Sequence, residues 1–304
     1  MRLTEQPSKY DNLEKKSVME IITDINNEDK TVAYAIEKVL PDLERLITAI
    51  EKQLKAGGRM FYVGCGTGGR LSVLDVVELP NTYGIDPEMI QTVLAGGVEN
   101  LVLALEEAED DIEEGWRTLV EKHHVTPKDI VVGISASGTT PYVLHTLRHC
   151  RENGIPTGSF VNNPQSPISD YSDYPVEVIT GTEYITGSTR MKCGTAQKMI
   201  CDMISSTVLI RLGRIEGNRM VNVRLINDKV VDRSVRMFME RNPSITDYEY
   251  VKEIIVKTGT VKKAEAYLKE KENYDSDCRQ RCHHHHVVCP GPRHRRRPVR
   301  ERGV

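Results

Sequence analysis

The segment from Met60 to Gly84 constrains the fold of this chain most. A short apolar run, residues 60–63, is followed by the glycine-rich sequence GCGTGG and then by apolar residues at helical spacing. This order predicts a buried strand, a tight turn and a helix. Glycines allow backbone N–H groups to approach an anion, and the start of a helix carries favourable partial positive charge. The segment therefore predicts a binding site for a phosphate group.

The rest of the chain repeats this alternation of strands and helices. Further strands are expected at residues 89–95, 129–135, 157–161 and 176–179. Helices are expected between them, including an acidic one over 98–122 and a long one from about Arg190, capped by residues 186–188. The pattern predicts an α/β fold with a doubly wound, mostly parallel sheet, whose ligands bind at the carboxyl ends of the strands.

Four regions are expected along the chain. Residues 1–56 form an N-terminal helical segment with a break at Asn26-Asn27, and residues 57–240 form the sheet domain. A linker at 242–246 leads into a small helical subdomain, residues 241–272. The basic tail, residues 273–304, is rich in His, Cys and Arg and is expected to be disordered.

Charge and composition exclude several classes of protein. The net charge is −3, but residues 278–304 hold eight arginines against one glutamate, a charge of +7, so the rest carries −10. An acidic body argues against a nucleic-acid partner. No apolar run is long enough for a membrane span and the N-terminus is polar, so we expect a cytoplasmic protein with no membrane contact. The cysteines and histidines of the tail match no zinc pattern, and no metal is expected.

A second loop, Ser135 to Thr140, offers four hydroxyl groups directly after a strand and before a helix. Such a loop suits the oxygens of a phosphate ester and the hydroxyls of a sugar. It lacks the lysine of a nucleotide-binding P-loop. GCGTGG partly matches a dinucleotide fingerprint, but the stretch at the end of the next strand, residues 93–97, contains no acidic residue that could bind a ribose. We therefore expect a small sugar phosphate as ligand and no cofactor.

Two carboxylates stand out as candidates for acid–base chemistry. Glu78 has apolar neighbours in sequence, and burial there would raise its pKa so that it could hold a proton. The second candidate is one member of an acidic cluster that follows the second strand and contains Glu106, Glu107, Glu109, Asp110 and Asp111. Two carboxyl groups in different environments are typical of general acid and general base catalysis.

Five segments of the chain resemble the N-acetylmuramic acid 6-phosphate etherases, a family with the sugar isomerase (SIS) fold that is related to the glucokinase regulatory protein. The segments are NNEDKTVAYAIEKVLP, GGRMFYVGCGTGGRLSVLDVVELPNTYG, LEEAEDD, VVGISASGTTPYV and TGSTRMKCGTAQK. They occur in this order between residue 11 and about residue 235, and the helical subdomain is less similar.

The resemblance implies a carbon–oxygen lyase of cell-wall amino sugar catabolism and peptidoglycan recycling. Such an enzyme removes D-lactate from N-acetylmuramate 6-phosphate by elimination across C2–C3 and then adds water, which leaves N-acetylglucosamine 6-phosphate. By position, Glu78 matches the proton donor and Glu109 the candidate base. The resemblance implies no metal or redox cofactor. It implies a homodimer with its active sites at the interface. The implied substrate-binding residues are Gly66, Thr67, Gly68, Ser135, Ser137, Thr139, Thr140 and Ser188.

The first loop departs from the family pattern G-A-G-T-S-G-R. Cys65 replaces the alanine, and Gly68 replaces the serine. A lost hydrogen bond to a charged group costs about 1.5–3 kcal/mol. This departure keeps two alternatives open. One is a non-catalytic sensor of sugar phosphates that acts through a protein contact, and the other is an aldose–ketose isomerase on the same fold.

Overall fold

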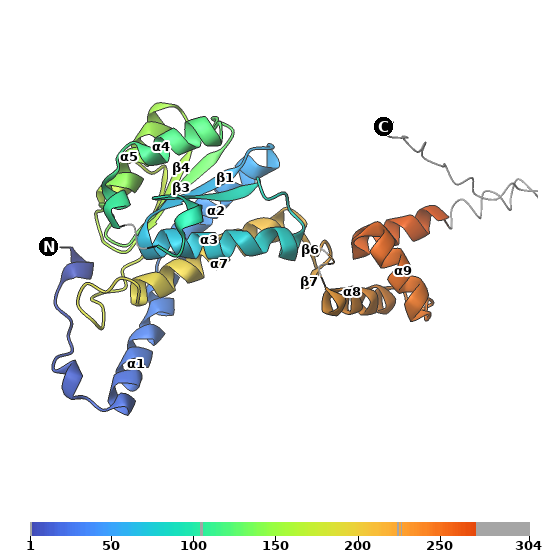
Figure 1. Ribbon diagram of the computed structural model, residues 1–304, viewed down its shortest axis with the longest axis horizontal. Coiled ribbons are helices and arrows are strands. Elements are labelled where there is room, and N and C mark those ends of the chain that lie inside the picture. Colours follow the sequence, from blue (N-terminus) through green and yellow to red (C-terminus); the bar gives the residue numbers. More distant parts are fainter. Residues whose placement is uncertain (1, 104–105, 224, 226, 272–304) are drawn as a thin grey trace, which may run out of the picture. The chain divides into compact units, whose positions relative to one another are not determined.

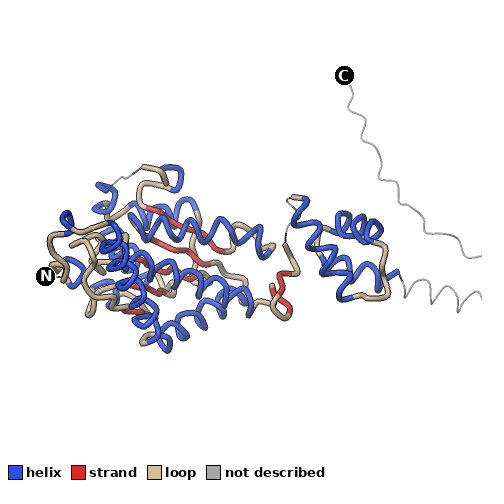
Figure 2. Tube along the Cα trace, turned by 90° about the horizontal axis from the view of Figure 1, so that it is seen from below, coloured by secondary structure: helices blue, strands red, loops and turns tan. Residues whose placement is uncertain are grey.

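The computed structural model describes residues 2–103, 106–223, 225 and 227–271, and the basic tail expected at 273–304 lies outside the described residues. The chain divides between residues 224 and 225 into two compact units, each described here by itself. The first unit contains a sheet of five parallel strands with helices on both faces (Figures 1 and 2). The α/β fold expected from the sequence is confirmed.

The strands lie in the order β2-β1-β3-β4-β5. Strand β2 is therefore added on one side of β1, and the later strands are added on the other side, beginning with β3. Ligands bind outside the carboxyl ends of the strands at such a point. The strands are β1 (Met60–Gly64), β2 (Ile90–Leu94), β3 (Ile130–Ser135), β4 (Thr157–Val161) and β5 (Tyr174–Glu177). The main helices of this unit are α1 (Val18–Glu37), α2 (Leu40–Lys55), α3 (Gly66–Tyr83), α4 (Glu114–Arg117), α5 (Pro141–Glu152), α6 (Pro167–Asp170) and α7 (Lys192–Arg211).

Each face of the sheet has its own hydrophobic core. Alternate side chains of a strand point to opposite faces, so Tyr62 faces a core with α1, α2, α3 and α7, whereas Phe61 faces a core with α5. Both rings are fully buried. These two layers hold the strand ends, and therefore the loops after β1 and β3, in fixed positions.

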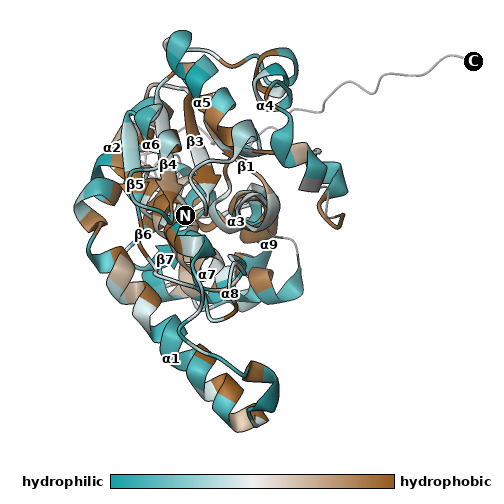
Figure 3. Ribbon diagram, turned by 90° about the vertical axis from the view of Figure 1, so that its left-hand side faces the viewer, coloured by the Kyte–Doolittle hydropathy of each residue, from teal (hydrophilic) through white to brown (hydrophobic). Residues whose placement is uncertain are grey.

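The helical break expected at Asn26-Asn27 is wrong. Helix α1 runs through both residues, because asparagine in a helix costs only a few tenths of a kcal/mol, and the break falls at Lys38-Val39, before Pro41 in the first turn of α2. The first turns of α1 extend beyond the sheet layers (Figures 1 and 3), and Val18 and Met19 are exposed there.

The acidic stretch over 98–122 is also less regular than expected. It contains the short 3-10 turns Val98–Asn100 and Glu106–Asp110, then α4 and a π-turn at Thr118–Lys122. Gly96 and Gly97, both with positive φ, separate this stretch from β2. This irregular segment is the one that carries Glu109.

Helix α7 has a different cap from the expected one. Residues 186–188 do not cap it; instead the buried carboxylate of Glu183 accepts hydrogen bonds from the backbone N–H groups of Lys192 (2.8 Å) and Cys193 (2.9 Å). A carboxylate at this position satisfies the open N–H groups and favours the helix dipole.

The second unit begins at Leu225, earlier than the boundary expected at residue 240. Helix α8 (Asp228–Arg241) packs against α9 (Tyr248–Thr258), and a last helix follows at 261–271. The stretch 242–246 therefore connects two helices of this unit. A short hairpin, β6 (Ile215–Glu216) and β7 (Arg219–Met220), closes the first unit. No helix among the described residues combines the length and the hydropathy of a membrane span.

Candidate active site

A cleft with two lobes opens at the carboxyl ends of β1 and β3. Both lobes are lined by Gly66 and Thr67 at the start of α3, by Glu109 and by Thr189. The first, which we call the hydroxyl lobe, has a volume of about 200 Å³ and includes the loop after β3. The second, which we call the arginine lobe, has a volume of about 330 Å³ and includes Arg70. The two phosphate-type loops expected from the sequence therefore meet in one site.

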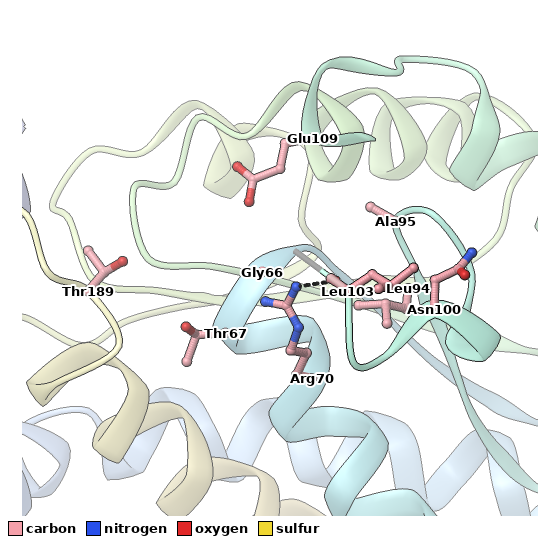
Figure 4. Close-up of a pocket in the computed structure, with 9 residues that line it drawn as sticks. All are labelled: Gly66, Thr67, Arg70, Leu94, Ala95, Asn100, Leu103, Glu109 and Thr189. Atoms are coloured by element: carbon pink, nitrogen blue, oxygen red, sulfur yellow. Dashed lines mark hydrogen bonds between the residues drawn. The ribbon is translucent and has the colours of Figure 1, made fainter. Parts of the chain in front are cut away.

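Glu109 lies directly over the start of α3, and its carboxylate points into the cleft (Figure 4). A Cβ atom at Gly66 would lie 3.0 Å from Glu109 Oε1, and Gly66 also has a φ of +50°. Only glycine combines this backbone conformation with such a close carboxylate. Gly66 thus allows Glu109 to reach the shared wall of the two lobes.

The hydroxyl lobe is built by a network of side chains in the loop after β3. Ser135 Oγ lies 2.9 Å from Thr140 Oγ1 and 3.3 Å from Ser137 Oγ, and it accepts a hydrogen bond from the Gly138 N–H at 3.0 Å. These bonds fold the loop so that three hydroxyls face the lobe. Hydroxyls and backbone N–H groups at a helix start form a neutral site for anionic oxygens.

Gly68 is buried at the back of the hydroxyl lobe. A Cβ atom there would come within 2.8 Å of Ile134 and 3.0 Å of Gln197 Oε1. Gln197, on α7, is buried and donates to Asn162 Oδ1 at 3.1 Å. A serine at residue 68 would therefore require Ile134 or Gln197 to shift.

The arginine lobe contains one cationic side chain among its described lining residues. The Arg70 Nε donates to the carbonyl of Leu101 (3.2 Å) and Nη2 to that of Leu103 (2.8 Å). Figure 4 shows the guanidinium below Glu109, beside Thr67. Asn100 and Leu103 complete this side of the lobe. The 98–103 segment thus fixes the orientation of Arg70.

An N-terminal strap, residues 2–16, brings a further carboxylate to the cleft. Glu5 lines the hydroxyl lobe, and a Cβ atom at Gly187 would lie 3.1 Å from its Oε2. Thr4 is buried and its hydroxyl accepts from Asn163 Nδ2 at 2.9 Å. Beyond Glu5, Ser8 donates to the Tyr184 carbonyl at 2.8 Å. The strap therefore holds Glu5 from both sides.

The end of the strap is anchored by a buried charged group. Glu28 of α1 accepts hydrogen bonds from Lys192 (2.8 Å), Lys9 (2.6 Å) and Tyr10 (2.9 Å). Burial by itself would raise the pKa of Glu28, but these three bonds lower it to about 2. Glu28 is thus charged at neutral pH and links the strap to the start of α7.

Cys65 lies in the wall of the hydroxyl lobe but is not a nucleophile. Burial, followed by the charge of Glu109, raises the pKa of its thiol well above the usual range. A thiol in this state is inert at neutral pH. The replacement of alanine by Cys65 thus fills space and supplies no chemistry.

Glu78 lies away from the cleft, on the exposed face of α3. Twelve residues of helix separate it from Gly66, which corresponds to about 18 Å. The expectation that Glu78 is buried is wrong for the single chain, because Leu79 points into the core while Val77 and Glu78 point outward. The structure therefore separates the two glutamates that the sequence brought together.

Most of the other expected residues line the cleft. They are Gly66, Thr67, Gly68, Ser135, Ser137, Thr140 and Glu109. Thr139 and Ser188 are not among the lining residues; Thr139 donates to Ser137 Oγ at 3.1 Å, and Thr189 takes the place expected for Ser188. Sequence reasoning missed Glu5, Arg70, Asn100, Thr189 and Gln197, of which Arg70, Thr189 and Gln197 lie within segments already singled out.

Comparisons with known proteins agree with this architecture. The family model described as the glucokinase regulatory protein N-terminal SIS domain matches residues 42–151, and the SIS domain model matches residues 118–206. Together these matches cover the sheet, both phosphate-type loops and Glu109. The SIS fold is therefore confirmed.

Whole-chain relatives define the family more narrowly. The N-acetylmuramic acid 6-phosphate etherase of Bacteroides thetaiotaomicron is 51% identical over 268 residues, which cover 88% of this chain and 96% of the relative. This chain belongs to the N-acetylmuramic acid 6-phosphate etherase family. The Porphyromonas gingivalis member is 49% identical, with 89% of this chain and 97% of the relative covered. The Clostridioides difficile member is 44% identical, with 75% and 74% covered. Family membership therefore spans both units of the chain.

Proposed function

We propose that this protein is an etherase that cleaves the D-lactyl ether of N-acetylmuramate 6-phosphate and releases D-lactate and N-acetylglucosamine 6-phosphate. The observation that carries the proposal is the position of Glu109, directly over Gly66 and Thr67 where the two lobes of the cleft join. The names of its relatives at about 50% identity support the same reaction.

The hydroxyl lobe suits the 6-phosphate of the substrate. Its hydroxyls and the start of α3 supply donors without a fixed positive charge, as phosphate sites at helix N-termini do. A phosphate held there leaves the sugar ring under Glu109. Glu5 and Gln197, at the edge and back of the lobe, are placed to contact sugar hydroxyls.

The reaction needs one base and one acid. Glu109 takes the proton from C2, the C3–O bond breaks, and the electron pair of the C2–H bond forms the C2–C3 double bond. The leaving lactyl oxygen takes a proton from the acid, and water then adds to the double bond. Glu109 suits the base because it is half-buried and faces both lobes. Glu78, the expected acid, is not in the cleft of its own chain.

We propose that a second copy of the chain supplies Glu78. Arg70, Leu74, Val77 and Glu78 occupy one stripe of α3, since their spacing returns to the same side of a helix. Leu74 and Val77 are 49% and 56% exposed, and Val102, in the segment that Arg70 binds, is 92% exposed. Arg70, one helical turn before Leu74, and Leu103, next to Val102, both line the arginine lobe, so a partner that covers the exposed apolar residues would lie close to the cleft.

The position of the stripe fits a two-fold contact. If α3 packs antiparallel on its copy with the axis near Leu74, residue 78 of one chain lies opposite residue 70 of the other. Glu78 of the partner subunit would then enter the arginine lobe, where the lactyl oxygen leaves. A homodimer with shared sites therefore accounts for both the exposed apolar stripe and the distant acid.

We propose that the protein acts in the cytoplasm. We also propose that it takes part in amino sugar catabolism and peptidoglycan recycling. Both follow from the proposed substrate, a phosphorylated cell-wall sugar, and from its hydrolysed product. The acidic body of the chain supports the absence of a nucleic-acid partner.

Release of lactate from N-acetylmuramate 6-phosphate tests the reaction directly. The protein is incubated with the compound, and D-lactate and N-acetylglucosamine 6-phosphate are measured together. Equal amounts of both products support the etherase. Tight binding of the compound without lactate would instead indicate the sensor, and conversion of hexose phosphates without lactate would indicate the isomerase.

A further inference from the structure

We propose that Arg70 binds the lactyl carboxylate of the substrate and so distinguishes the substrate from the sugar phosphate product. This inference rests on the proposed function and adds to it the residue that recognises the leaving group. N-acetylmuramate 6-phosphate has two anionic groups, whereas N-acetylglucosamine 6-phosphate has only the phosphate. A cation that serves the carboxylate alone would therefore discriminate between them.

The geometry gives Arg70 a fixed orientation with donors to spare. A guanidinium has five N–H donors in a rigid plane. The Leu101 carbonyl accepts a hydrogen bond from Nε and the Leu103 carbonyl accepts one from Nη2. These two bonds fix the plane of the guanidinium. Both acceptors belong to one wall of the lobe, and the opposite edge of the guanidinium faces the cavity beside Thr67 (Figure 4). Two N–H groups on one edge match the two oxygens of a carboxylate.

The charges of the cleft favour this assignment. Among the described residues that line the two lobes, Arg70 is the one Lys or Arg side chain, whereas Glu5 and Glu109 supply negative charge. Within the described part of the chain, Arg70 donates to two backbone carbonyls and to no carboxylate. Of these two glutamates only Glu109 lines the arginine lobe, and a half-buried Arg70 in the same lobe attracts an anionic group of the ligand and offsets the charge of Glu109.

The two lobes can also bind the two anionic groups of the substrate separately. The hydroxyl lobe offers neutral donors at a helix start, which bind phosphate without a cation. The arginine lobe is separated from it by Gly66 and Thr67, and Glu109 lies above both. With the phosphate in the first lobe, the lactyl group extends past Glu109 toward Arg70. Its ether oxygen would then lie between the base and the guanidinium.

Binding of the two sugar phosphates to a protein that cannot turn over tests the proposal. Glu109→Gln is the background, and Arg70→Met and Arg70→Lys are added to it; affinities are measured by calorimetry. For Arg70→Met we expect at least a tenfold weaker affinity for N-acetylmuramate 6-phosphate and less than a twofold change for N-acetylglucosamine 6-phosphate. We expect Arg70→Lys to lie between, since lysine keeps the charge but not the two-pronged geometry.

Two controls separate recognition from structure and from net charge. Arg117→Met removes the same charge from an exposed site on α4 and should leave both affinities within twofold. If the Arg70 variants do not fold, the ligand is changed instead: the lactyl amide of N-acetylmuramate 6-phosphate should bind the Glu109→Gln protein about as weakly as the product does.

Equal weakening for both sugar phosphates would overturn the proposal, because it would mean that Arg70 binds the phosphate or only holds the 98–103 segment. Unchanged affinity for both would overturn it as well. A wild-type protein that releases no lactate would instead contradict the proposed function, whatever the Arg70 variants do.

Discussion

Glu109 and Glu78, the two glutamates to which we assign the acid–base chemistry, occupy opposite kinds of environment. Glu109 is half-buried over a glycine in the cleft, whereas Glu78 lies exposed on a helix beside Val77, which is also exposed. Gly66, with its positive φ, leaves room for Glu109 above the start of α3. Glu78 is exposed on its own chain. The proposed dimer accounts for this contrast: Glu109 is positioned by its own chain, and Glu78 would be positioned by the contact with a second copy.

Replacement of each glutamate by glutamine probes this contrast with the largest expected effect. We expect Glu109→Gln to lower kcat by about 10²–10⁴-fold, because it removes the base, and Glu78→Gln to lower it comparably by removing the acid. Lactate release under saturating substrate measures both. A Glu78→Gln enzyme with wild-type kcat would mean that another group is the acid.

The exposed stripe around Glu78 can be broken without touching either glutamate. Val77→Asp should lower activity more than tenfold at low protein concentration, because a buried charge opposes dimer formation. Activity should recover partly as the concentration rises, in parallel with the dimer fraction seen by sedimentation. Met19→Asp, on the exposed start of α1, is the matched control and should change neither the activity nor the dimer fraction. Loss of the dimer in the Met19 variant instead would place the contact on α1.

Glu5 is the third carboxylate in the comparison and the one held by a distant strap. Glu5→Gln should raise KM about tenfold and change kcat less, since we place Glu5 against sugar hydroxyls and not at the reacting atoms. Glu14→Gln alters an exposed glutamate of the same strap and should change neither value. A change confined to kcat would contradict this role.

Asp75 faces inward from the same helix that presents Glu78 outward. Burial raises the pKa of Asp75 to about 6, although Ser205 donates to it at 2.8 Å. The folded state therefore prefers the protonated acid, and stability is lost as the pH rises from about 4 to above 6. Asp75→Asn should stabilise the protein by up to about 3 kcal/mol at pH 8, with little effect at pH 3.5 and little on activity. Melting curves at the two pH values measure this; equal effects at both would contradict the assignment.

The strands and both phosphate-type loops could be predicted from the sequence because their signals are local. Apolar runs that end in glycine or in hydroxyl residues mark strand ends, and parallel strands bring those ends together. Position in the chain indicated only the acidic cluster at residues 106–111, and the family resemblance singled out Glu109 within it. The cap by Glu183 and the anchor at Glu28 could not be predicted, since each is a side-chain contact between separate segments that no local sequence pattern relates to each other.

The environment of Glu78 shows why the remaining predictions failed. Its neighbours Val77 and Leu79 are both apolar, which suggested burial, but consecutive residues of a helix lie about 100° apart. Leu79 reaches the core and Val77 does not. Glu5 and Arg70 were missed for a related reason, because their contacts, with Gly187 and with the 101–103 carbonyls, depend on folding across distant segments.

Complementation between two inactive variants tests most directly whether one site needs two chains. Glu78→Gln and Glu109→Gln proteins are mixed under conditions that exchange subunits, and lactate release is measured with the mixed dimer confirmed by native mass spectrometry. If Glu78 acts in the partner's cleft, each mixed dimer holds one intact site, and an equal mixture should regain about a quarter of wild-type activity. Confirmed mixed dimers with no gain in activity would show that both glutamates act within one chain and would contradict the account.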